Sequence, residues 1–230
     1  MDKRLEKIAQ MIQNGRGVAD VGTDHGFLPV RLARNGYTGR LFASDINLGP
    51  LSAARRSAEA AGAEDRIEFL LCDGLEDCPR DEIDTIVIAG MGGDAICGIL
   101  DRAEWCMDGG YTLLLQPMTK AEVLRYWLVN NGFRLTREAI VPDGRALYQI
   151  IEARCAGNMP LSDAELFVGA FENIKSDPSA PELISRSIGR MRKEISGLLE
   201  ASEPNTGRLT VCRSVLDGLI KMKGELKCVP

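Results

Sequence analysis

Acidic residues at the ends of two expected strands carry the clearest chemistry in this sequence. Residues 17–27 read Gly-Val-Ala-Asp-Val-Gly-Thr-Asp-His-Gly-Phe: a short apolar strand enters a turn of small residues that carries Asp24, and a helix follows. Such a turn at the carboxyl edge of a sheet lets a ligand approach bare backbone amides, and the helix N-terminus adds a partial positive charge. Asp45 ends a second expected strand, where a carboxylate can accept both hydroxyls of a ribose. The two acids predict a nucleotide pocket.

The position of Asp24 indicates which nucleotide the pocket binds. A dinucleotide-binding turn has the pattern G-x-G-x-x-G because it must admit a pyrophosphate. Here Asp24 stands where the second glycine would be, and it would repel a diphosphate. S-adenosylmethionine has no phosphate and carries a sulfonium and an ammonium group, so the acidic turn favours it as the cofactor. The alternative is an ordinary strand-to-helix turn in which Asp24 or Thr23 caps the helix.

The composition is that of a folded α/β protein. The 230 residues suit one full domain with an appendage, and the 45% hydrophobic content supports a buried core. The sequence has no run of about 18 or more apolar residues, and residues 1–7 read as a charged amphipathic helix rather than a signal segment. We therefore expect a cytoplasmic protein that makes no use of the membrane.

Cysteine and histidine usage argues against a metal centre. The single histidine, His25, excludes sites with several histidine ligands. The cysteines include no C-x-x-C pair, so they predict neither a zinc cluster nor a paired disulfide set, and reduced, mostly buried thiols are expected. No metal is expected. The seven cysteines are Cys72, Cys78, Cys97, Cys106, Cys155, Cys212 and Cys228.

The alternation of β-rich and helical segments from Gly17 to Ala153 predicts a parallel sheet covered on both faces. Two further β-rich runs, separated by the turn signal Pro142-Asp143-Gly144, predict a hairpin. A parallel sheet that ends in an antiparallel hairpin is the build expected of a methyltransferase core. The expected strands are 17–21, 40–45, 67–72, 83–89, 111–115, 133–141 and 146–153, and the expected helices are 27–35, 48–61, 93–103 and 121–131.

The C-terminal part of the chain reads as wholly helical. Residues 155–161 form an expected linker, and beyond it apolar residues recur at steps of three and four on two helices joined by a turn at 203–207. The apolar stripe indicates a coiled-coil-like seam between these helices, with partner binding as the alternative. We therefore expect a Rossmann-like α/β domain at 1–155 and an all-helical hairpin domain at 156–230.

Four segments together resemble the bacterial tRNA (adenine(22)-N1)-methyltransferase family. The resemblance covers residues 1–155 closely and the helical domain in layout. Gly26 stands where the family often has Ala, and Met118 stands where Asn is common; neither change touches the chemistry. The segments are Val18-Ala19-Asp20-Val21-Gly22-Thr23-Asp24-His25-Gly26-Phe27-Leu28-Pro29, Asp45-Ile46-Asn47-Leu48-Gly49-Pro50-Leu51, Ile88-Ala89-Gly90-Met91-Gly92-Gly93 and Leu114-Leu115-Gln116-Pro117.

The resemblance implies methyl transfer from S-adenosylmethionine to N1 of an adenine in the D-arm region of tRNA, at position 22. It implies a fold with a Rossmann-like core and a tRNA partner. The residues expected around the cofactor are Asp20, Gly22, Thr23, His25, Asp45, Ile46, Asp73, Gly74, Ala89, Gly90 and Met91, and those expected near the substrate in the core include Gly92, Gln116 and Pro117.

Asp24 is the expected catalytic residue. Adenine N1 has an in-plane lone pair, so the enzyme must expose and aim the base rather than remove a proton first. The base becomes cationic as the methyl group arrives, and a carboxylate that accepts a hydrogen bond from the exocyclic amine would orient the ring and stabilise that charge. Asp20 lies within the strand, so we expect it to contact the amino end of the donor or the turn. His25 could form a hydrogen bond near the cofactor; the alternative is that it has only a structural role in the turn.

Glycines follow the fourth expected strand, where enzymes that methylate the exocyclic amine of adenine commonly carry Asn/Asp-Pro-Pro-Tyr/Phe. The sequence there is Ala89-Gly90-Met91-Gly92-Gly93, which argues against amine methylation and would admit a flat base or the donor close to the backbone. A glycine-rich helix start is the alternative. Asp73-Gly74 after the third strand could accept a hydrogen bond from the adenine amine of the cofactor, or could be an ordinary turn.

A cationic stripe on the first C-terminal helix is the expected tRNA contact. The net charge is −5, but from Gly157 onward ten acidic residues face ten basic ones. Arg186, Arg190 and Lys193 fall at steps of four and three, which places three cations on one helix face. Such a stripe could also be a solvated face, and the resemblance favours binding. Arg31 and Arg34 could extend it.

Three other functions fit parts of this pattern. A methyltransferase of the same build could act on another RNA, a protein or a small molecule. A non-catalytic adapter could use the helical hairpin as its binding element, although the intact acidic turn and Asp45 argue against this. A nicotinamide oxidoreductase conflicts with the charge of the turn.

Overall fold

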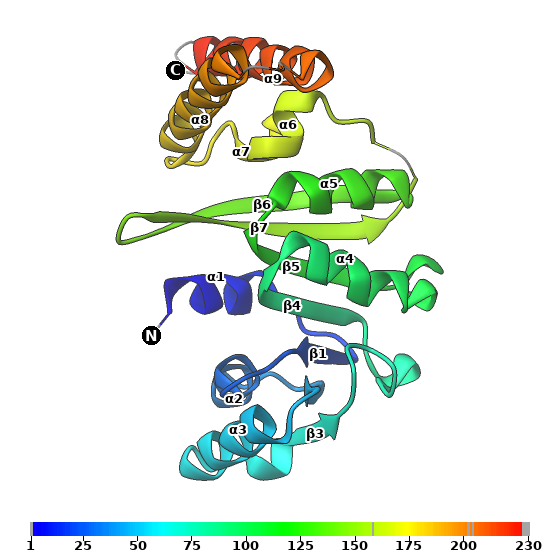
Figure 1. Ribbon diagram of the computed structural model, residues 1–230. Helices are drawn as coiled ribbons and strands as arrows, with labels where there is room; N and C mark the ends of the chain where they lie inside the picture. The colour runs from blue at the N-terminus through cyan, green and yellow to red at the C-terminus, as the bar shows by residue number, and fades with distance from the viewer. Residues whose placement is uncertain (1, 158, 202, 204, 227–230) are drawn as a thin grey trace.

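A single seven-stranded sheet forms the centre of the computed structural model, which describes residues 2–157, 159–201, 203 and 205–226 (Figure 1). The strand order is β3-β2-β1-β4-β5-β7-β6. Strands β1 to β5 pair in parallel, whereas β7 runs antiparallel between β5 and β6. The strands are β1 Gly17–Val21, β2 Arg40–Asp45, β3 Ile67–Leu71, β4 Thr85–Gly92, β5 Thr112–Thr119, β6 Phe133–Asp143 and β7 Ala146–Cys155.

The expected Rossmann-like α/β core with a terminal antiparallel hairpin is confirmed. Strands β4 and β5 differ from expectation, because they run on to Gly92 and Thr119 past the expected ends at Ala89 and Leu115. The two strands stay paired through the glycine-rich segment, with register shifts on either side of Met91. The backbone around Met91 is therefore held by the sheet rather than by a loose loop.

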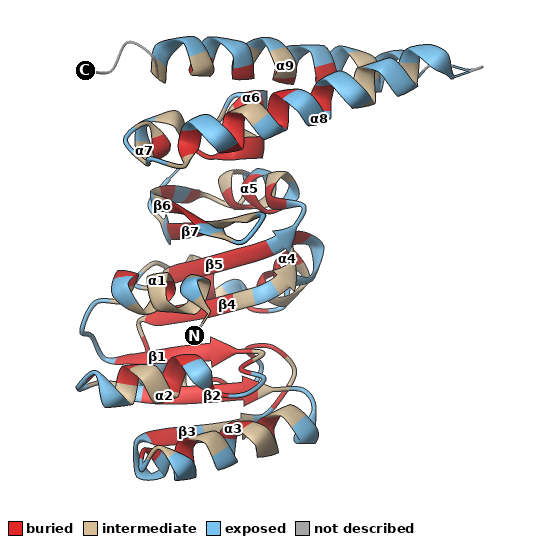
Figure 2. Cartoon of the chain, turned by 90° about the vertical axis from the view of Figure 1, so that its left-hand side faces the viewer, coloured by how far each residue is buried: buried red, intermediate tan, exposed pale blue. Residues whose placement is uncertain are grey.

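Helices cover both faces of the sheet. Apolar side chains of α1 Lys3–Met11, α2 Phe27–Arg34 and α3 Leu48–Ala60 pack on one face, in a core with Val18, Leu41 and Val87. The helices α4 Gly93–Asp101 and α5 Ala121–Asn130 pack on the other face. The inner strands are buried along most of their length, as Figure 2 shows. Short 3-10 helices lie at Glu64–Arg66, Arg80–Glu82 and Glu104–Met107.

The C-terminal region is helical, as expected, and has its own apolar core. The long helices α8 Ala180–Glu200 and α9 Thr206–Leu226 form the expected hairpin. Two short helices, α6 Asp163–Val168 and α7 Phe171–Ile174, were not predicted from the sequence. They lie between this hairpin and the sheet (Figure 1). The expected turn at 203–207 is shorter than predicted because α9 begins at Thr206; Pro204 in that turn and Asn158 in the expected linker lie outside the described residues.

The cysteines of the described residues are free thiols, and all of them except Cys155 are buried. Burial raises the pKa of Cys78 and Cys106 to about 12, so these thiols stay protonated and unreactive. Cys228 lies outside the described residues. No helix in the described part of the chain has the length and apolar character needed to cross a membrane.

A buried ion pair joins the sheet to the helical region. Arg125 on α5 has a side chain that is 1% exposed, and its guanidinium pairs with the Glu138 carboxylate on β6 at 2.8 Å. The same guanidinium donates to the carbonyl of Leu166 in α6 at 2.9 Å and to the Gln149 amide oxygen on β7 at 2.8 Å. The second Glu138 oxygen accepts from the backbone N–H of Ala170 at 2.7 Å. Helix α5 and strand β6 thereby hold helix α6 and the start of helix α7.

Substitution of Arg125 by Met should lower the free energy of unfolding by about 3–5 kcal/mol, because it leaves the Glu138 carboxylate buried without a counter-charge. Urea unfolding of the purified variant measures this change. The Arg125→Met/Glu138→Gln double variant removes the unpaired charge and should recover part of the loss. A double variant as unstable as the single one would contradict this account of the pair.

Candidate active site

The turn after β1 has a backbone shape that its residues favour. Gly22 has φ +70° and Gly26 has φ +67°, the left-handed region that glycine enters without a steric penalty. Asp24 also lies there, at φ +53°, which is uncommon for a residue with a side chain and is found at ligand sites. The N–H groups of Gly22 and Thr23 both donate to the carbonyl of Ser44 on β2 at 2.9 Å. The turn is therefore fixed to the neighbouring strand.

This turn forms the wall of a cavity of about 630 Å³, called here the active-site cavity. It opens at the carboxyl ends of β1 and β4, where the strand order reverses and where ligands of open α/β sheets bind. The lining residues are Asp2, Arg4, Leu5, Asp20, Gly22, Thr23, Asp24, His25, Phe27, Leu28, Asp45, Asn47, Pro50, Ala89, Gly90, Met91 and Met118.

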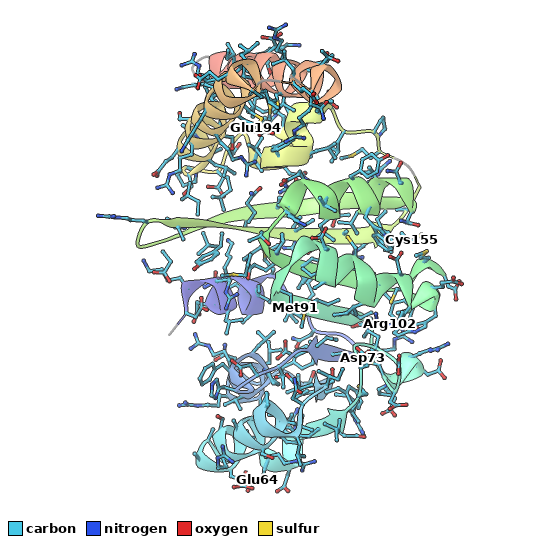
Figure 3. The ribbon with its side chains drawn as sticks, viewed as in Figure 1. Glu64, Asp73, Met91, Arg102, Cys155 and Glu194 are labelled. Atoms are coloured by element: carbon cyan, nitrogen blue, oxygen red, sulfur yellow. The ribbon has the colours of Figure 1, made fainter. Side chains whose placement is uncertain are left out.

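A second hollow of about 290 Å³ adjoins the active-site cavity. It is lined by Ile46, Asp73, Gly74 and Ile99 among others, and it shares Gly22, Asp45, Asn47 and Met91 with the larger cavity. Figure 3 labels Met91 near the end of β4. All eleven residues expected around the cofactor therefore line one or other of two adjoining hollows.

Asp20 is a buried carboxyl at the floor of the active-site cavity. It is 6% exposed, and its Oδ2 accepts a hydrogen bond from the Thr23 hydroxyl at 2.6 Å. Burial raises the pKa of Asp20 from 3.8 to about 6, while the bond from Thr23 opposes that shift. No cation of the described residues pairs with it. A ligand that brings a positive group to this floor would supply the missing counter-charge.

Asp24 lies in a different environment, at the mouth of the cavity. Its side chain is 71% exposed, and it accepts no hydrogen bond from the part of the chain that the structure describes. The His25 Nε2 atom lies 3.7 Å from the Asp24 Oδ1 atom, and the His25 ring stacks on the exposed ring of Phe27 with 5.3 Å between centroids. The mouth thus offers an acceptor beside an apolar aromatic surface.

The two acids of the second hollow, Asp45 and Asp73, have different hydrogen-bond partners. Asp45 Oδ1 accepts from the backbone N–H of Asn47 at 2.8 Å, which leaves Oδ2 for a ligand. Asp73 Oδ1 accepts from Arg102 at 2.8 Å, and Figure 3 shows the two side chains next to each other. The Ile46 side chain is exposed and lines the same hollow as an apolar surface. A ribose beside Asp45 and a flat base beside Ile46 fit this arrangement.

Arg4 is a cavity residue that the sequence analysis did not identify. Its guanidinium donates to the Gln116 Oε1 atom at 2.6 Å and pairs with Asp2 at 2.7 Å. A side chain at Gly90 would bring its Cβ to within 3.1 Å of the Arg4 Nη1 atom, so the guanidinium packs directly over that backbone. A charged amphipathic helix is expected at residues 1–7, but no local signal indicates that its Arg4 side chain reaches Gln116 on β5 and the backbone of Gly90 on β4.

The expected substrate residues fall into three groups. Gln116 is fully buried: its amide oxygen accepts from Arg4 and from the Gly90 N–H at 3.1 Å, so it supports the cavity from beneath. Pro117, Arg186 and Arg190 line a different cavity, beyond Met118. The remaining residues, Gly92, Arg31, Arg34 and Lys193, line neither hollow of the active site, and Arg31 pairs with Glu6 of α1 at 2.5 Å. Their roles toward a substrate stay predictions.

Comparison with known proteins agrees with this geometry. The family model described as a methyltransferase domain matches residues 1–151. The tRNA (adenine(22)-N(1))-methyltransferase of Bacillus subtilis is 34% identical over 176 residues, which cover 74% of each chain. The chain belongs to the tRNA (adenine(22)-N(1))-methyltransferase family.

Solved structures extend the likeness to the helical region. The crystal structure of the Bacillus subtilis M1A22 tRNA methyltransferase TrmK has a TM-score of 0.79 at 28% identity and covers 99% of this chain and 97% of its own. A Streptococcus pneumoniae protein solved in complex with S-adenosyl-L-methionine has a TM-score of 0.82 at 27% identity and covers 97% of this chain and 99% of its own. This family likeness therefore includes both the core and the C-terminal helices.

The residues present fit S-adenosylmethionine, the cofactor of this methyltransferase. The unpaired buried carboxyl of Asp20 suits the ammonium group of the donor, and the acceptors and apolar wall of the second hollow suit its adenosine. Gly22 lines both hollows at φ +70°, where a side chain would strain the backbone, and the Met91 Cε atom lies 2.1 Å from where its Cβ would stand. The described residues of the turn include no lysine or arginine to hold a pyrophosphate.

The affinity of the enzyme for S-adenosylhomocysteine should fall about tenfold from about pH 7 to about pH 5. In the free protein the Asp20 carboxyl takes up a proton as the pH falls through about 6, and only the ionised form attracts an ammonium group. The stability of the free protein depends on pH in the opposite direction. Because the Asp20 pKa is raised from 3.8 to about 6 in the fold, the free energy of unfolding falls as the pH rises through this range. Calorimetric titrations at the two pH values measure the affinity.

Asp20→Asn is the control for this titration. The variant should bind more weakly at neutral pH and show a flat profile over the same range, because its amide does not titrate. An affinity of the unmodified enzyme that is equal at both pH values would contradict the assignment of Asp20 to the donor amine.

Proposed function

We propose that this chain transfers the methyl group of S-adenosylmethionine to N1 of adenine 22 in tRNA. The observation that carries the proposal is the Asp24 carboxylate, which is exposed at the mouth of the active-site cavity and is free of hydrogen bonds from the described residues. The family relative from Bacillus subtilis bears the name of this activity. We infer a cytoplasmic location from the tRNA substrate.

Bound S-adenosylmethionine supplies an electrophilic methyl group on a sulfonium. The adenine N1 lone pair needs no prior deprotonation, so the work of the protein is to bind, aim and stabilise. Asp24 accepts a hydrogen bond from the exocyclic amine of the adenine, which sets the rotation of the ring in its plane. The same carboxylate stabilises the positive charge that the ring gains as N1 is methylated.

The substrate adenine must leave its base pair or stack to reach this site, because N1 lies on the pairing edge. The active-site cavity has room for a base next to the donor, and its rim carries the exposed side chains of Phe27 and Met118. These apolar surfaces replace the stacking that the base loses when it turns out. No Pro-Pro aromatic clamp for an exocyclic amine follows β4, which supports N1 as the acceptor atom.

Mapping the methylated nucleoside tests the proposal. Unmodified tRNA transcript is incubated with the enzyme and S-adenosylmethionine, digested at neutral pH and analysed by mass spectrometry. We expect 1-methyladenosine at position 22, and none in a transcript with guanosine at that position. Methylation of the exocyclic amine, of another position or of no tRNA at all would overturn the proposed function.

Asp24→Asn should lower kcat by about tenfold or more and leave the affinity for S-adenosylhomocysteine nearly unchanged. The amide keeps the size of the side chain but loses the charge that stabilises the methylated ring. Single-turnover methylation of tRNA measures the rate, and Asp65→Asn, at an exposed acid on a 3-10 helix away from the cavity, is the matched control. Full activity of the Asp24 variant would remove this residue from the chemistry.

A further inference from the structure

A cavity of about 280 Å³, called here the α8 cavity, lies between the sheet and the helical region. Met118 lines both this cavity and the active-site cavity, so the two adjoin. Its walls come from the end of β5, the start of α5, the start of β7, and helices α6 and α8. The lining residues are Pro117, Met118, Thr119, Lys120, Ala121, Glu122, Ala146, Leu147, Tyr148, Gln149, Phe167, Leu183, Arg186, Ser187 and Arg190.

Cations outnumber acids in the lining of this cavity. Lys120, Arg186 and Arg190 contribute positive charge, and Glu122 contributes one negative charge. Lys120 pairs with Asp94, and Arg186 pairs with Glu182 and donates to the carbonyl of Arg145 at 2.5 Å. These two cations are partly neutralised, so the charge available to a ligand comes mainly from Arg190.

Arg190 is held by an aromatic ring rather than by a carboxylate. Its guanidinium carbon lies 5.1 Å from the centroid of the Phe167 ring, and no acid of the described residues pairs with it. A cation–π contact uses the face of the guanidinium and leaves the N–H groups at its edge for hydrogen bonds. An arginine in this state is suited to bidentate recognition of a phosphate.

Ser187 supplies a second observation that points to a ligand. The residue is 7% exposed and lines the α8 cavity, and its hydroxyl has no hydrogen-bond partner among the described residues. The hydroxyl is therefore available to donate a hydrogen bond to an acceptor that enters the cavity. Ser187 precedes Arg190 by three residues on α8, so the two side chains share one face of the helix.

We propose that the α8 cavity binds the phosphate of a nucleotide that flanks the methylated adenine. The inference rests on the proposed function, and it assigns to this cavity a part of the tRNA that the active-site cavity does not contact. Arg190 and Ser187 bind the phosphate oxygens, and Met118 separates this nucleotide from the turned-out base. Phosphate contacts fix the register of a nucleic acid on a protein. This contact therefore holds the strand on one side of the base while the base occupies the neighbouring cavity.

The aromatic side chain of Tyr148 connects the two cavities. Its ring lines the α8 cavity, and the Arg4 guanidinium of the active-site cavity lies 5.6 Å from its centroid. The strand of RNA that passes Met118 therefore meets a ring on which a base or ribose can lie. The α8 cavity, Tyr148 and the active-site cavity thus form one continuous surface that contacts both the backbone and the base of the substrate.

A matched pair of arginines on α8 tests the inference. Arg190→Ala should weaken tRNA binding about tenfold and reduce the salt dependence of log Kd by about one unit of slope, because one phosphate contact is lost. Arg192 lies on the same helix, is exposed and lines no wall of the α8 cavity, so Arg192→Ala removes the same charge and should change both quantities much less. Ser187→Ala should weaken binding in the same direction as Arg190→Ala, with a smaller salt effect.

Two further measurements separate recognition from folding. S-adenosylhomocysteine affinity and the thermal midpoint should be unchanged in Ser187→Ala, and S-adenosylhomocysteine affinity should be unchanged in Arg190→Ala. Arg190→Lys keeps the charge but loses the bidentate geometry, so it should restore the salt slope and only part of the affinity.

Equal tRNA affinities and salt slopes for Arg190→Ala and Arg192→Ala would overturn the inference. The binding measurement does not require methylation, so the result decides the role of the α8 cavity even in an experiment where nucleoside mapping fails to find 1-methyladenosine. That failure would instead overturn the proposed function. Loss of S-adenosylhomocysteine binding in both Arg190→Ala and Ser187→Ala would also contradict the inference, because it would show a structural role of the cavity in the donor site.

Discussion

The Arg125 guanidinium, buried between the sheet and the helical region, holds together the surfaces on which the proposed function depends. It pairs with Glu138 and also donates to Gln149 and to the carbonyl of Leu166, so α5, β6, β7 and α6 share one buried polar network. Each charged group in it has partners, which offsets the cost of removing both charges from water. Further bonds reinforce the junction: Asp177 accepts from the Ile140 N–H at 2.9 Å, and Asn173 donates to the Leu135 carbonyl at 3.1 Å.

The position of helix α8 relative to the active site follows from this junction. Gln149 belongs to the network and also lines the α8 cavity, as does Phe167 on α6, the neighbour of Leu166. Arg190 rests on Phe167, so the network sets the place of the cation through one aromatic ring. A substrate that bridges the two cavities meets walls whose separation is fixed before it binds.

The active site separates two carboxylates by environment. Asp20 is buried, has a raised pKa and lacks a cation, whereas Asp24 is exposed and lies beside His25. The first arrangement favours a positive group that arrives with the donor. The second favours a hydrogen-bond donor on the substrate and a charge that develops during the reaction. A single strand and its turn therefore serve the donor with one acid and the acceptor base with the other.

Local patterns in the sequence predicted the parts of this site that local structure builds. The β1 turn, the acid at the end of β2 and the helical hairpin are contained in short segments whose residue types specify their backbone, and the eleven cofactor residues converge because parallel strands end at one edge. Arg4, Phe167, Ser187 and the Arg125–Glu138 pair depend on contacts between distant segments. The periodicity and spacing of residues within one segment do not predict contacts between distant segments. Strand β5 runs past its expected end at Leu115 for a similar reason. Its pairing with β4 continues through Pro117, a residue type that often ends a strand.

The most direct test of this account is a crystal structure of the enzyme with S-adenosylhomocysteine and unmodified tRNA. We expect adenine 22 to be turned out into the active-site cavity, with its exocyclic amine on Asp24 and its N1 directed at the sulfur. We also expect a flanking phosphate to lie on Arg190 and Ser187, beyond Met118. A complex in which the adenine remains stacked in the tRNA, or in which another group occupies the place beside Asp24, would contradict it.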